Sequence, residues 1–273
     1  MAEFNFQDKT IHYEVYGESG EWLLCLNGIM MSTLSWKPFI ETFSANNRLV
    51  LFDFLDQGQS SRMSENYKQE VQAEVLEAVL AELNITRANI MGISYGGEVA
   101  IEHAIKYPKR IRRLFLANTV AKTDAWLTDI GTAWNAVGEQ ADGRAYYYTT
   151  IPAIYSAKFY SARLDWMRRR EQILFPIMDN KTVMATFKRL VISAESYDVS
   201  DKLHLIDCPT LLVSCSDDVL TPLSMQRVLH DGIKGSEWIV INDCGHASMY
   251  EKPELFAALV LGWFNRIEKD IVV

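Results

Sequence analysis

Short apolar runs alternate with helix-like patterns over the first 120 residues of the chain. Trp22–Leu26 and Leu49–Phe52 are uninterrupted apolar runs, which is typical of strands that are covered on both faces. Between Glu70 and Leu83, apolar residues recur at helical spacing, and Ala88–Ile93 is a further strand-like run. Strands that alternate with helices in this way predict βαβ units and a mainly parallel sheet.

The same alternation predicts the other elements of this sheet. Ile11–Tyr16 alternates apolar and polar positions, as expected of an edge strand in a hairpin. We expect a helix over residues 96–107, which ends before Pro108, and a strand over residues 111–117. Late in the chain, the pattern predicts strands over residues 210–214 and 238–241, a helix after Pro222 and a last helix over residues 253–267.

The alternation of strand-like runs and helical patterns stops over residues 121–203. The segment is rich in aromatic residues and is predicted to be helical, with no obvious buried strand. The sequence therefore predicts an α/β core made of residues 1–120 and 204–273, and a helical cap or lid made of residues 121–203. The aromatic side chains either line an apolar pocket that excludes water or bury one face of each helix on the core. They are Trp126, Trp134, Tyr146, Tyr147, Tyr148, Tyr155, Phe159, Tyr160, Trp166 and Phe175.

The composition limits the classes of function. With 273 residues, 49% hydrophobic and 23% charged, the chain suits one large globular domain or a core with a modest insertion. A formal charge of −8 argues against nucleic acid as a partner, because its phosphates would be repelled. The start MAEFNFQDK lacks the basic and apolar regions of a secretory signal, and no stretch reaches the roughly 18 apolar residues of a membrane span.

Four cysteines are scattered through the chain with no Cys-x-x-Cys pair, at Cys25, Cys208, Cys215 and Cys244. We interpret them as reduced core residues rather than as disulfide partners or metal ligands. We therefore expect a cytoplasmic protein that uses no metal and no cofactor.

One motif with chemical meaning lies between a predicted strand and a predicted helix. Gly92-Ile93-Ser94-Tyr95-Gly96 contains Gly-x-Ser-x-Gly, at the point where the strand 88–93 turns into the next helix. A serine on such a turn is held in a strained conformation, and the helix N-terminus offers N–H groups to a developing oxyanion. Ser94 is therefore the predicted nucleophile. The alternative is a glycine-rich turn with a solvated serine.

A serine nucleophile needs a base, and the base needs a carboxylate that orients it. Of the five histidines, only His246 lies in a loop after a late predicted strand, at the carboxyl edge where sites of open α/β sheets form. Asp217 and Asp218 follow the strand 210–214 at the same edge. We favour Asp218 as the orienting acid and Asp217 as a residue that stabilises the turn. The chain order Ser, Asp, His is that of α/β-hydrolases.

Over essentially its whole length, the sequence resembles the α/β-hydrolase fold family. The resemblance rests on Leu26-Asn27-Gly28, on Asp53 to Ser60, on the turn at Ser94, on Cys208 to Val213, on Asp218 to Pro222, and on Gly245-His246 followed by Glu251-Lys252-Pro253. It implies a mostly parallel central sheet flanked by helices, and an oxyanion hole formed by the backbone N–H groups of Ile29 and Tyr95. Where the family usually has His-Gly, this chain has Asn27-Gly28, so anchoring of that loop by a histidine is lost. The expected substrate contacts are Gly28, Met30, Trp126 and Tyr155.

Three functions stay open from the sequence. The first is a serine hydrolase of the carboxylesterase type, which cleaves an ester of a small to medium apolar acyl group through an acyl-enzyme. The second is an acyltransferase that uses acyl-carrier or CoA thioesters with a hydroxyacid as acceptor. Asn27-Gly28 and Gly58-Gln59-Ser60 are similar to the bacterial acyltransferase that makes the hydroxyacyl lipid precursor of rhamnolipids. The third is a ligand receptor that keeps these residues but turns over negligibly.

The charge of the middle segment motivates the acyltransferase hypothesis. Residues 158–189 contain eight basic residues and three acidic ones, within a chain whose net charge is −8. Such a segment would dock an acidic acyl carrier protein or the phosphates of coenzyme A. The alternative is a solvated helix face.

Overall fold

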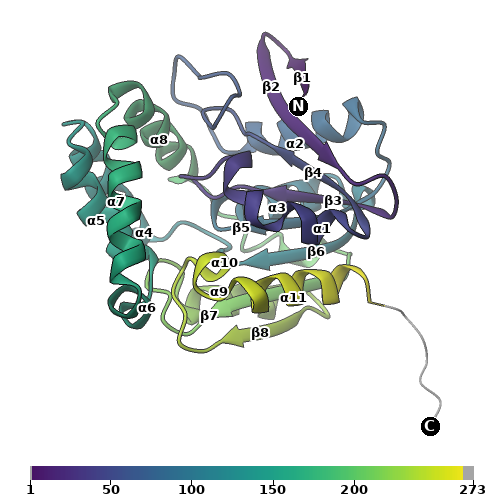
Figure 1. The fold of residues 1–273 in the computed structure, drawn as a ribbon. Helices are drawn as coiled ribbons and strands as arrows, with labels where there is room; N and C mark the ends of the chain where they lie inside the picture. Colours follow the sequence, from purple (N-terminus) through teal and green to yellow (C-terminus); the bar gives the residue numbers. More distant parts are fainter. Residues whose placement is uncertain (1, 267–273) are drawn as a thin grey trace.

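The structure of the protein, a computed structural model, describes residues 2–266 and is built around one eight-stranded sheet (Figure 1). Its strands are β1 (Ala2–Phe6), β2 (Lys9–Tyr16), β3 (Glu21–Leu26), β4 (Asn47–Phe52), β5 (Ala88–Ile93), β6 (Ile111–Ala117), β7 (Thr210–Cys215) and β8 (Glu237–Ile241). Their order across the sheet is β1-β2-β4-β3-β5-β6-β7-β8. β1, β2 and β4 pair antiparallel, and all other neighbours pair parallel. The predicted α/β class with a mostly parallel sheet is confirmed.

Each face of the sheet has its own apolar core, because successive side chains of a strand point to opposite faces. On β3, Leu24 and Leu26 belong to the core that is shared with α2 (Glu70–Glu82), α3 (Tyr95–Lys106) and α9 (Leu223–Gly232). Leu23 and Cys25 belong to the other core, which is closed by a 3-10 helix (Thr33–Phe39), α1 (Ile40–Ser44) and α11 (Pro253–Phe264). Burial on both faces explains why these strands are continuous apolar runs.

Five α-helices lie between β6 and β7 in the chain, and they stand beside the carboxyl ends of the parallel strands (Figure 1). They are α4 (Ala125–Gly138), α5 (Gly143–Ile154), α6 (Ala157–Ala162), α7 (Leu164–Met178) and α8 (Lys181–Ala194), and they are called the helical insertion below. The helical insertion has an apolar cluster of its own, in which Tyr146, Tyr147 and Met167 are buried. Short helical turns at Pro108–Arg110 and Leu203–Leu205, together with α10 (Ser248–Glu251), complete the elements.

Two of the predicted elements differ from the structure. Ile11–Tyr16 is part of a hairpin strand, but it is not the edge strand, because β1 pairs along its outer side. The prediction overlooked β1, whose alternating residues Ala2–Phe6 are only partly buried. The last helix ends at Phe264, and the predicted final residue 267 lies outside the described residues.

All four cysteines are free and buried, as expected of core residues. Among the described residues, no helix has both the length and the apolar character that crossing a bilayer requires. Within residues 2–266, no group of three or more His, Cys, Asp or Glu side chains is placed to hold a metal ion.

Candidate active site

Ser94 lies at the sharp turn between β5 and α3. Its backbone has φ 53° and ψ −123°, a positive-φ conformation that a serine adopts only where the surrounding structure holds it. The N–H of Ser94 donates to the carbonyl of Ala117 on β6 at 2.9 Å, and the carbonyl of Ser94 accepts from the N–H groups of Gly97 and Glu98 at 2.8 and 3.1 Å. These bonds hold the turn, so that Ser94 stands at the carboxyl edge of the sheet.

Two glycines allow the strand and the helix to approach closely at this turn. A Cβ at Gly92 would lie 2.4 Å from the carbonyl oxygen of Gly96, and a Cβ at Gly96 would lie 2.5 Å from the carbonyl oxygen of Leu26. Backbone atoms at such distances leave no room for a side chain. The Gly-x-Ser-x-Gly spacing therefore follows from the packing of β3, β5 and α3.

His246 and Asp218 meet beyond the carboxyl ends of β7 and β8. The Oδ2 of Asp218 lies 2.9 Å from the Nδ1 of His246. The same carboxylate accepts the N–H groups of Leu220 and Thr221 at 2.9 Å each, the Thr221 hydroxyl at 2.7 Å and the Asn118 amide at 2.8 Å. Burial raises the pKa of Asp218, but the adjacent imidazole and the hydrogen bonds from His246 and Thr221 outweigh burial and lower the pKa to about 2. An ionised Asp218 favours a proton on Nδ1 of His246 and leaves Nε2 free to accept one.

Asp217 has a different environment. It is exposed, its N–H donates to the carbonyl of Cys244 at 2.9 Å, and its Oδ1 accepts the hydroxyl of Ser216 at 2.7 Å. These contacts lie within the turn after β7, and only Asp218 of the two aspartates bonds to His246.

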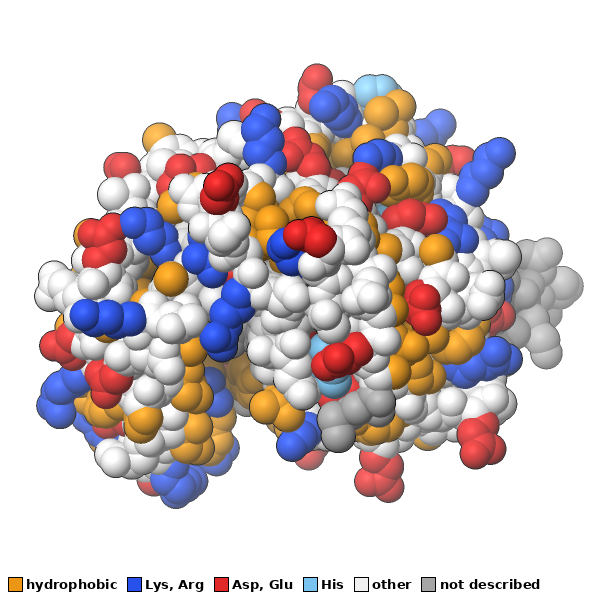
Figure 2. All heavy atoms as spheres, turned by 90° about the horizontal axis from the view of Figure 1, so that it is seen from above, with side chains coloured by type: hydrophobic (Ala, Val, Ile, Leu, Met, Phe, Trp, Pro, Cys, Tyr) orange, Lys and Arg blue, Asp and Glu red, His pale blue; other side chains and the backbone are white. Residues whose placement is uncertain are grey.

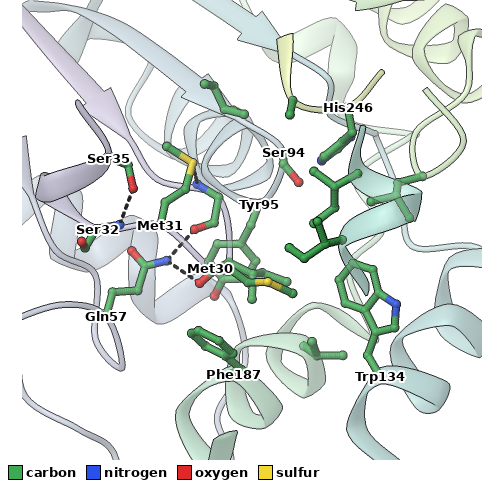
Figure 3. Close-up of a pocket in the computed structure, with 18 of the residues that line it drawn as sticks. Met30, Met31, Ser32, Ser35, Gln57, Ser94, Tyr95, Trp134, Phe187 and His246 are labelled. Carbon is green, nitrogen blue, oxygen red and sulfur yellow. Dashed lines mark hydrogen bonds between the residues drawn. The ribbon is translucent and has the colours of Figure 1, made fainter. Parts of the chain in front are cut away.

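Ser94 and His246 line the same cavity, and their side chains point toward each other (Figure 3). Ile29 and Tyr95 line the same cavity. Tyr95 is the first residue of α3, so its N–H has no partner within the helix. The loop that carries Ile29 lies against the nucleophile, because a Cβ at Gly28 would be 3.7 Å from the Cβ of Ser94.

Two side-chain amides anchor this loop. The amide of Asn27 donates to Oε1 of Gln57 at 3.0 Å, and its carbonyl accepts the indole N–H of Trp36 at 2.7 Å. The amide of Gln57 in turn donates to the carbonyls of Gly28 at 2.8 Å and Ile29 at 3.3 Å (Figure 3). Asn27 and Gln57 thus replace the anchoring that the histidine of the family pattern would provide.

The cavity has a volume of about 630 Å³ and lies between the carboxyl ends of the strands and the helical insertion. Its wall on the insertion side is mostly apolar, with Leu127, Ile130, Trp134, Ile151, Ile154, Ile173, Leu174, Ile177, Val183, Phe187 and Val191. Leu34, Ile173 and Ile177 line the cavity and are also exposed to solvent. These three side chains therefore form an apolar rim at its mouth.

Three of the four predicted substrate contacts line the cavity: Gly28, Met30 and Tyr155. Trp126 does not, and its side chain is 59% exposed. On α4 the cavity-lining positions are Leu127, Thr128, Ile130, Gly131 and Trp134, which recur at helical spacing along one side of the helix. Position 126 lies off that face of the helix, and Trp134 occupies the place expected of Trp126.

Most aromatic residues of the helical insertion pack against one another. The rings of Tyr147 and Phe175 meet edge to face with centroids 5.3 Å apart, and Tyr155 stacks on Phe159 at 5.6 Å. Of the ten aromatic residues named from the sequence, all of which the structure describes, only Trp134 and Tyr155 line the cavity. Mutual packing therefore accounts for most of the aromatic content.

Two polar residues of the site were not predicted from the sequence. Asn118 follows β6 with φ 48°, and its amide bonds to Asp218. Because Asn118 directly follows a strand at the carboxyl edge of the sheet, its position in the sequence could have identified it as a candidate. Glu98 lines the cavity one turn after Ser94 on α3 and accepts a hydrogen bond from Gln69 at 2.6 Å. Burial raises the pKa of Glu98 to about 7, and nothing in the sequence distinguishes it from a solvated glutamate.

Comparison with known proteins identifies the family. Residues 21–253 match the model of the alpha/beta hydrolase fold. The crystal structure of MGS-M2, an alpha/beta hydrolase enzyme from a Medee basin deep-sea metagenome library, superimposes with a TM-score of 0.97 at 45% identity over 100% of both chains. The 3-oxoadipate enol-lactonase 1 of Acinetobacter baylyi is 27% identical over 97% of this chain and 96% of its own length, and a proline iminopeptidase of Lactobacillus helveticus is 24% identical over 96% of each chain. These relatives support a hydrolase enzyme, and the chain belongs to the alpha/beta hydrolase fold family.

Proposed function

We propose that the protein is a serine hydrolase that cleaves carboxylic esters of small to medium apolar acyl groups through an acyl-enzyme. The observation that carries the proposal is the arrangement of Asp218, His246 and Ser94 at the cavity. Asp218 bonds to Nδ1 of His246 at 2.9 Å, and the other side of the imidazole faces Ser94. A serine nucleophile requires this order of carboxylate, imidazole and hydroxyl.

Each residue has a defined role in the proposed reaction. The Ser94 hydroxyl attacks the ester carbonyl while Nε2 of His246 takes its proton, and Asp218 stabilises the imidazolium that forms. The N–H groups of Ile29 and Tyr95 donate to the oxyanion of the tetrahedral intermediate. The imidazolium then protonates the leaving alcohol, and a water molecule that His246 deprotonates releases the acid from Ser94.

The apolar wall of the cavity supports the proposed substrate class. A volume of about 630 Å³ lies within the range of sites for small ligands, and aliphatic side chains would exclude water from an acyl chain. We also propose that residues 121–203 form the cap of the site and that residues 1–120 and 204–273 form its core. The position of the cavity between these two parts supports that division.

The charges of the helical insertion favour hydrolysis over acyl transfer from a carrier protein. Five of the eight basic side chains over residues 158–189 form ion pairs within the chain: Lys158 with Asp243, Arg168 with Glu171, Arg169 with Asp165, Lys188 with Glu139 and Arg189 with Asp56. On the face in Figure 2, basic and acidic side chains are intermingled. A non-catalytic receptor has the least support, because Ser94, His246 and Asp218 are all present.

Turnover of 4-nitrophenyl butyrate and hexanoate tests the proposal. We expect a burst of 4-nitrophenol followed by steady hydrolysis, and Ser94→Ala should lower kcat by about 10⁴-fold or more. Undiminished turnover by Ser94→Ala would contradict the nucleophile. Product analysis with acyl-carrier thioesters and a hydroxyacid distinguishes hydrolysis from acyl transfer. A condensed ester in place of free acid would favour the acyltransferase.

A further inference from the structure

Arg170 is a charged residue in the wall of the cavity that lacks an ionic partner among the described residues. It lies on α7 and lines the same cavity as Ser94 and His246. Its guanidinium lies 4.9 Å from the ring centre of Trp166 and 5.2 Å from that of Tyr250. Cation–π contacts of this kind orient the guanidinium plane, but they do not supply a negative charge.

The acidic residues next to this cluster are engaged elsewhere. Glu171, the neighbour of Arg170 in the chain, pairs with Arg168. Glu251, the neighbour of Tyr250, accepts hydrogen bonds on both of its carboxylate oxygens from other groups. The Nε of Arg170 is buried without a hydrogen-bond partner. Within residues 2–266, therefore, no carboxylate neutralises this guanidinium.

The preceding arginines on the same helix behave differently. Arg168 and Arg169 each form an ion pair and are more than half exposed. Arg170 differs in that it faces the cavity. An unpaired cation in a partly buried site is costly unless an anion joins it, and a planar guanidinium binds carboxylates through two parallel hydrogen bonds.

We propose that Arg170 forms an anion subsite, so that the preferred ester substrates carry a carboxylate remote from the bond that is cleaved. The inference rests on the proposed esterase function and names the substrate class of that site. The ester carbonyl would lie at Ser94 and the carboxylate at Arg170. Tyr155 and Leu174, which also line the cavity, would contact the apolar linker between them.

A matched pair of substrates tests the subsite. Mono-(4-nitrophenyl) adipate carries a free carboxylate, and methyl 4-nitrophenyl adipate is its neutral counterpart. The wild-type enzyme should have a kcat/KM about tenfold or more higher for the acid. Arg170→Gln should lower kcat/KM for the acid by about 10- to 100-fold, the range of a charge-assisted hydrogen bond, and change the value for the neutral ester by less than about twofold. Arg170→Lys keeps the charge but not the planar guanidinium. Its kcat/KM for the acid should therefore lie between the values of the wild type and Arg170→Gln.

Two further variants control for loss of charge. Arg169→Gln removes a cation from the exposed side of α7 and should leave both substrates unaffected. Arg62→Gln removes an exposed cation that also lines the cavity, and its effect should be less than about threefold. The subsite is refuted by an equal preference for both esters in the wild type, by equal losses for both in Arg170→Gln, or by a loss in Arg62→Gln as large as in Arg170→Gln.

A binding measurement separates this inference from the proposed mechanism. Calorimetry on Ser94→Ala protein should show tighter binding of monomethyl adipate than of dimethyl adipate, and adding Arg170→Gln should remove the difference. Equal binding of both molecules to the Ser94→Ala protein would overturn the anion subsite. The two failures are distinguishable: activity retained by Ser94→Ala would contradict the serine mechanism, whereas equal binding of the two molecules would contradict only the anion subsite.

Discussion

The carboxylate of Glu251 binds Ser156 through two hydrogen bonds, from the N–H at 2.7 Å and from the hydroxyl at 2.6 Å. Ser156 caps α6 in the helical insertion. The same carboxylate accepts the N–H of Gly245 at 3.1 Å, and Gly245 precedes His246. One buried side chain therefore connects the loop of the proposed base to the insertion, and we expect Glu251 to act as a positioning residue.

Removing this carboxylate should displace the His246 loop. We expect Glu251→Ala to lower kcat for 4-nitrophenyl butyrate by about 100-fold with little change in KM, because a shift on the order of 1 Å in a reacting group has effects of this size. Steady-state kinetics on Glu251→Ala and the wild type gives the separate changes in kcat and KM.

Two variants show whether Glu251 acts by positioning. Glu251→Gln keeps one carbonyl acceptor and should recover part of kcat, while Ser156→Ala removes only one of the three hydrogen bonds and should cost about threefold. A Glu251→Ala enzyme with full kcat, or one whose kcat falls only because the protein unfolds at the assay temperature, would disprove the positioning role.

The two neighbouring aspartates should differ sharply in their effect on activity. Asp218→Asn puts an amide against Nδ1 of His246 and favours the wrong tautomer, so we expect kcat to fall by about 10⁴-fold. Asp217→Asn changes an exposed residue of the turn and should cost less than about threefold. Kinetics of the two purified variants compares them directly, and equal losses would show that the orienting acid is misassigned.

The buried carboxyl of Glu98 should give the protein a characteristic dependence of stability on pH. Burial raises the pKa of Glu98 from 4.5 to about 7, although Gln69 and His246 lower it in part. Between these two values the folded protein binds the proton more strongly than the unfolded chain, so the free energy of unfolding falls as pH rises. The shifted pKa of Glu98 should change the free energy of unfolding by on the order of 3 kcal/mol over this pH range, at about 1.4 kcal/mol per pKa unit.

Glu98→Gln should remove this contribution. Urea denaturation from pH 5 to pH 8 should show a flatter profile for the variant than for the wild type. Burial also raises the pKa of Glu102 to about 8, and the charge of Glu98 adds to that rise, so Glu98→Gln lowers the pKa of Glu102 as well and flattens the profile further. Parallel profiles for the two proteins would mean that Glu98 titrates normally.

Close packing at Gly96 should make even one methyl group harmful. A Cβ there would lie 2.5 Å from the carbonyl oxygen of Leu26 and 2.7 Å from that of Asn27, both of which are backbone atoms. We expect Gly96→Ala to lower the free energy of unfolding by about 3 kcal/mol and to impair activity through the adjacent loop. Gly262→Ala on α11 is the matched control: a Cβ there meets nothing within 4 Å, and it should stabilise the helix by roughly 0.5–1 kcal/mol. Denaturation curves that do not separate the two variants would contradict the packing argument.

The sequence by itself determined the buried strands of the sheet and the position of the candidate nucleophile. Strands such as β3 and β5 are buried on both faces, so their apolar runs are local signals that need no knowledge of neighbours. The turn at Ser94 is equally local, because strand, glycines and helix follow one another directly in the chain. The preference for Asp218 over Asp217 also came from the sequence, as an inference from its position before Pro222.

Only the tertiary structure decided which side chains share the cavity. Trp126 and Trp134 lie on one helix and look alike in the sequence, but the direction in which α4 packs sends one to solvent and the other to the cavity. Arg170 was one of eight similar basic residues until the fold placed it beside two rings and, among the described residues, without an ion pair. The anchoring of the loop by Asn27 likewise depends on Gln57, thirty residues further along the chain. Such contacts depend on the approach of distant segments, and a local pattern carries no information about that approach.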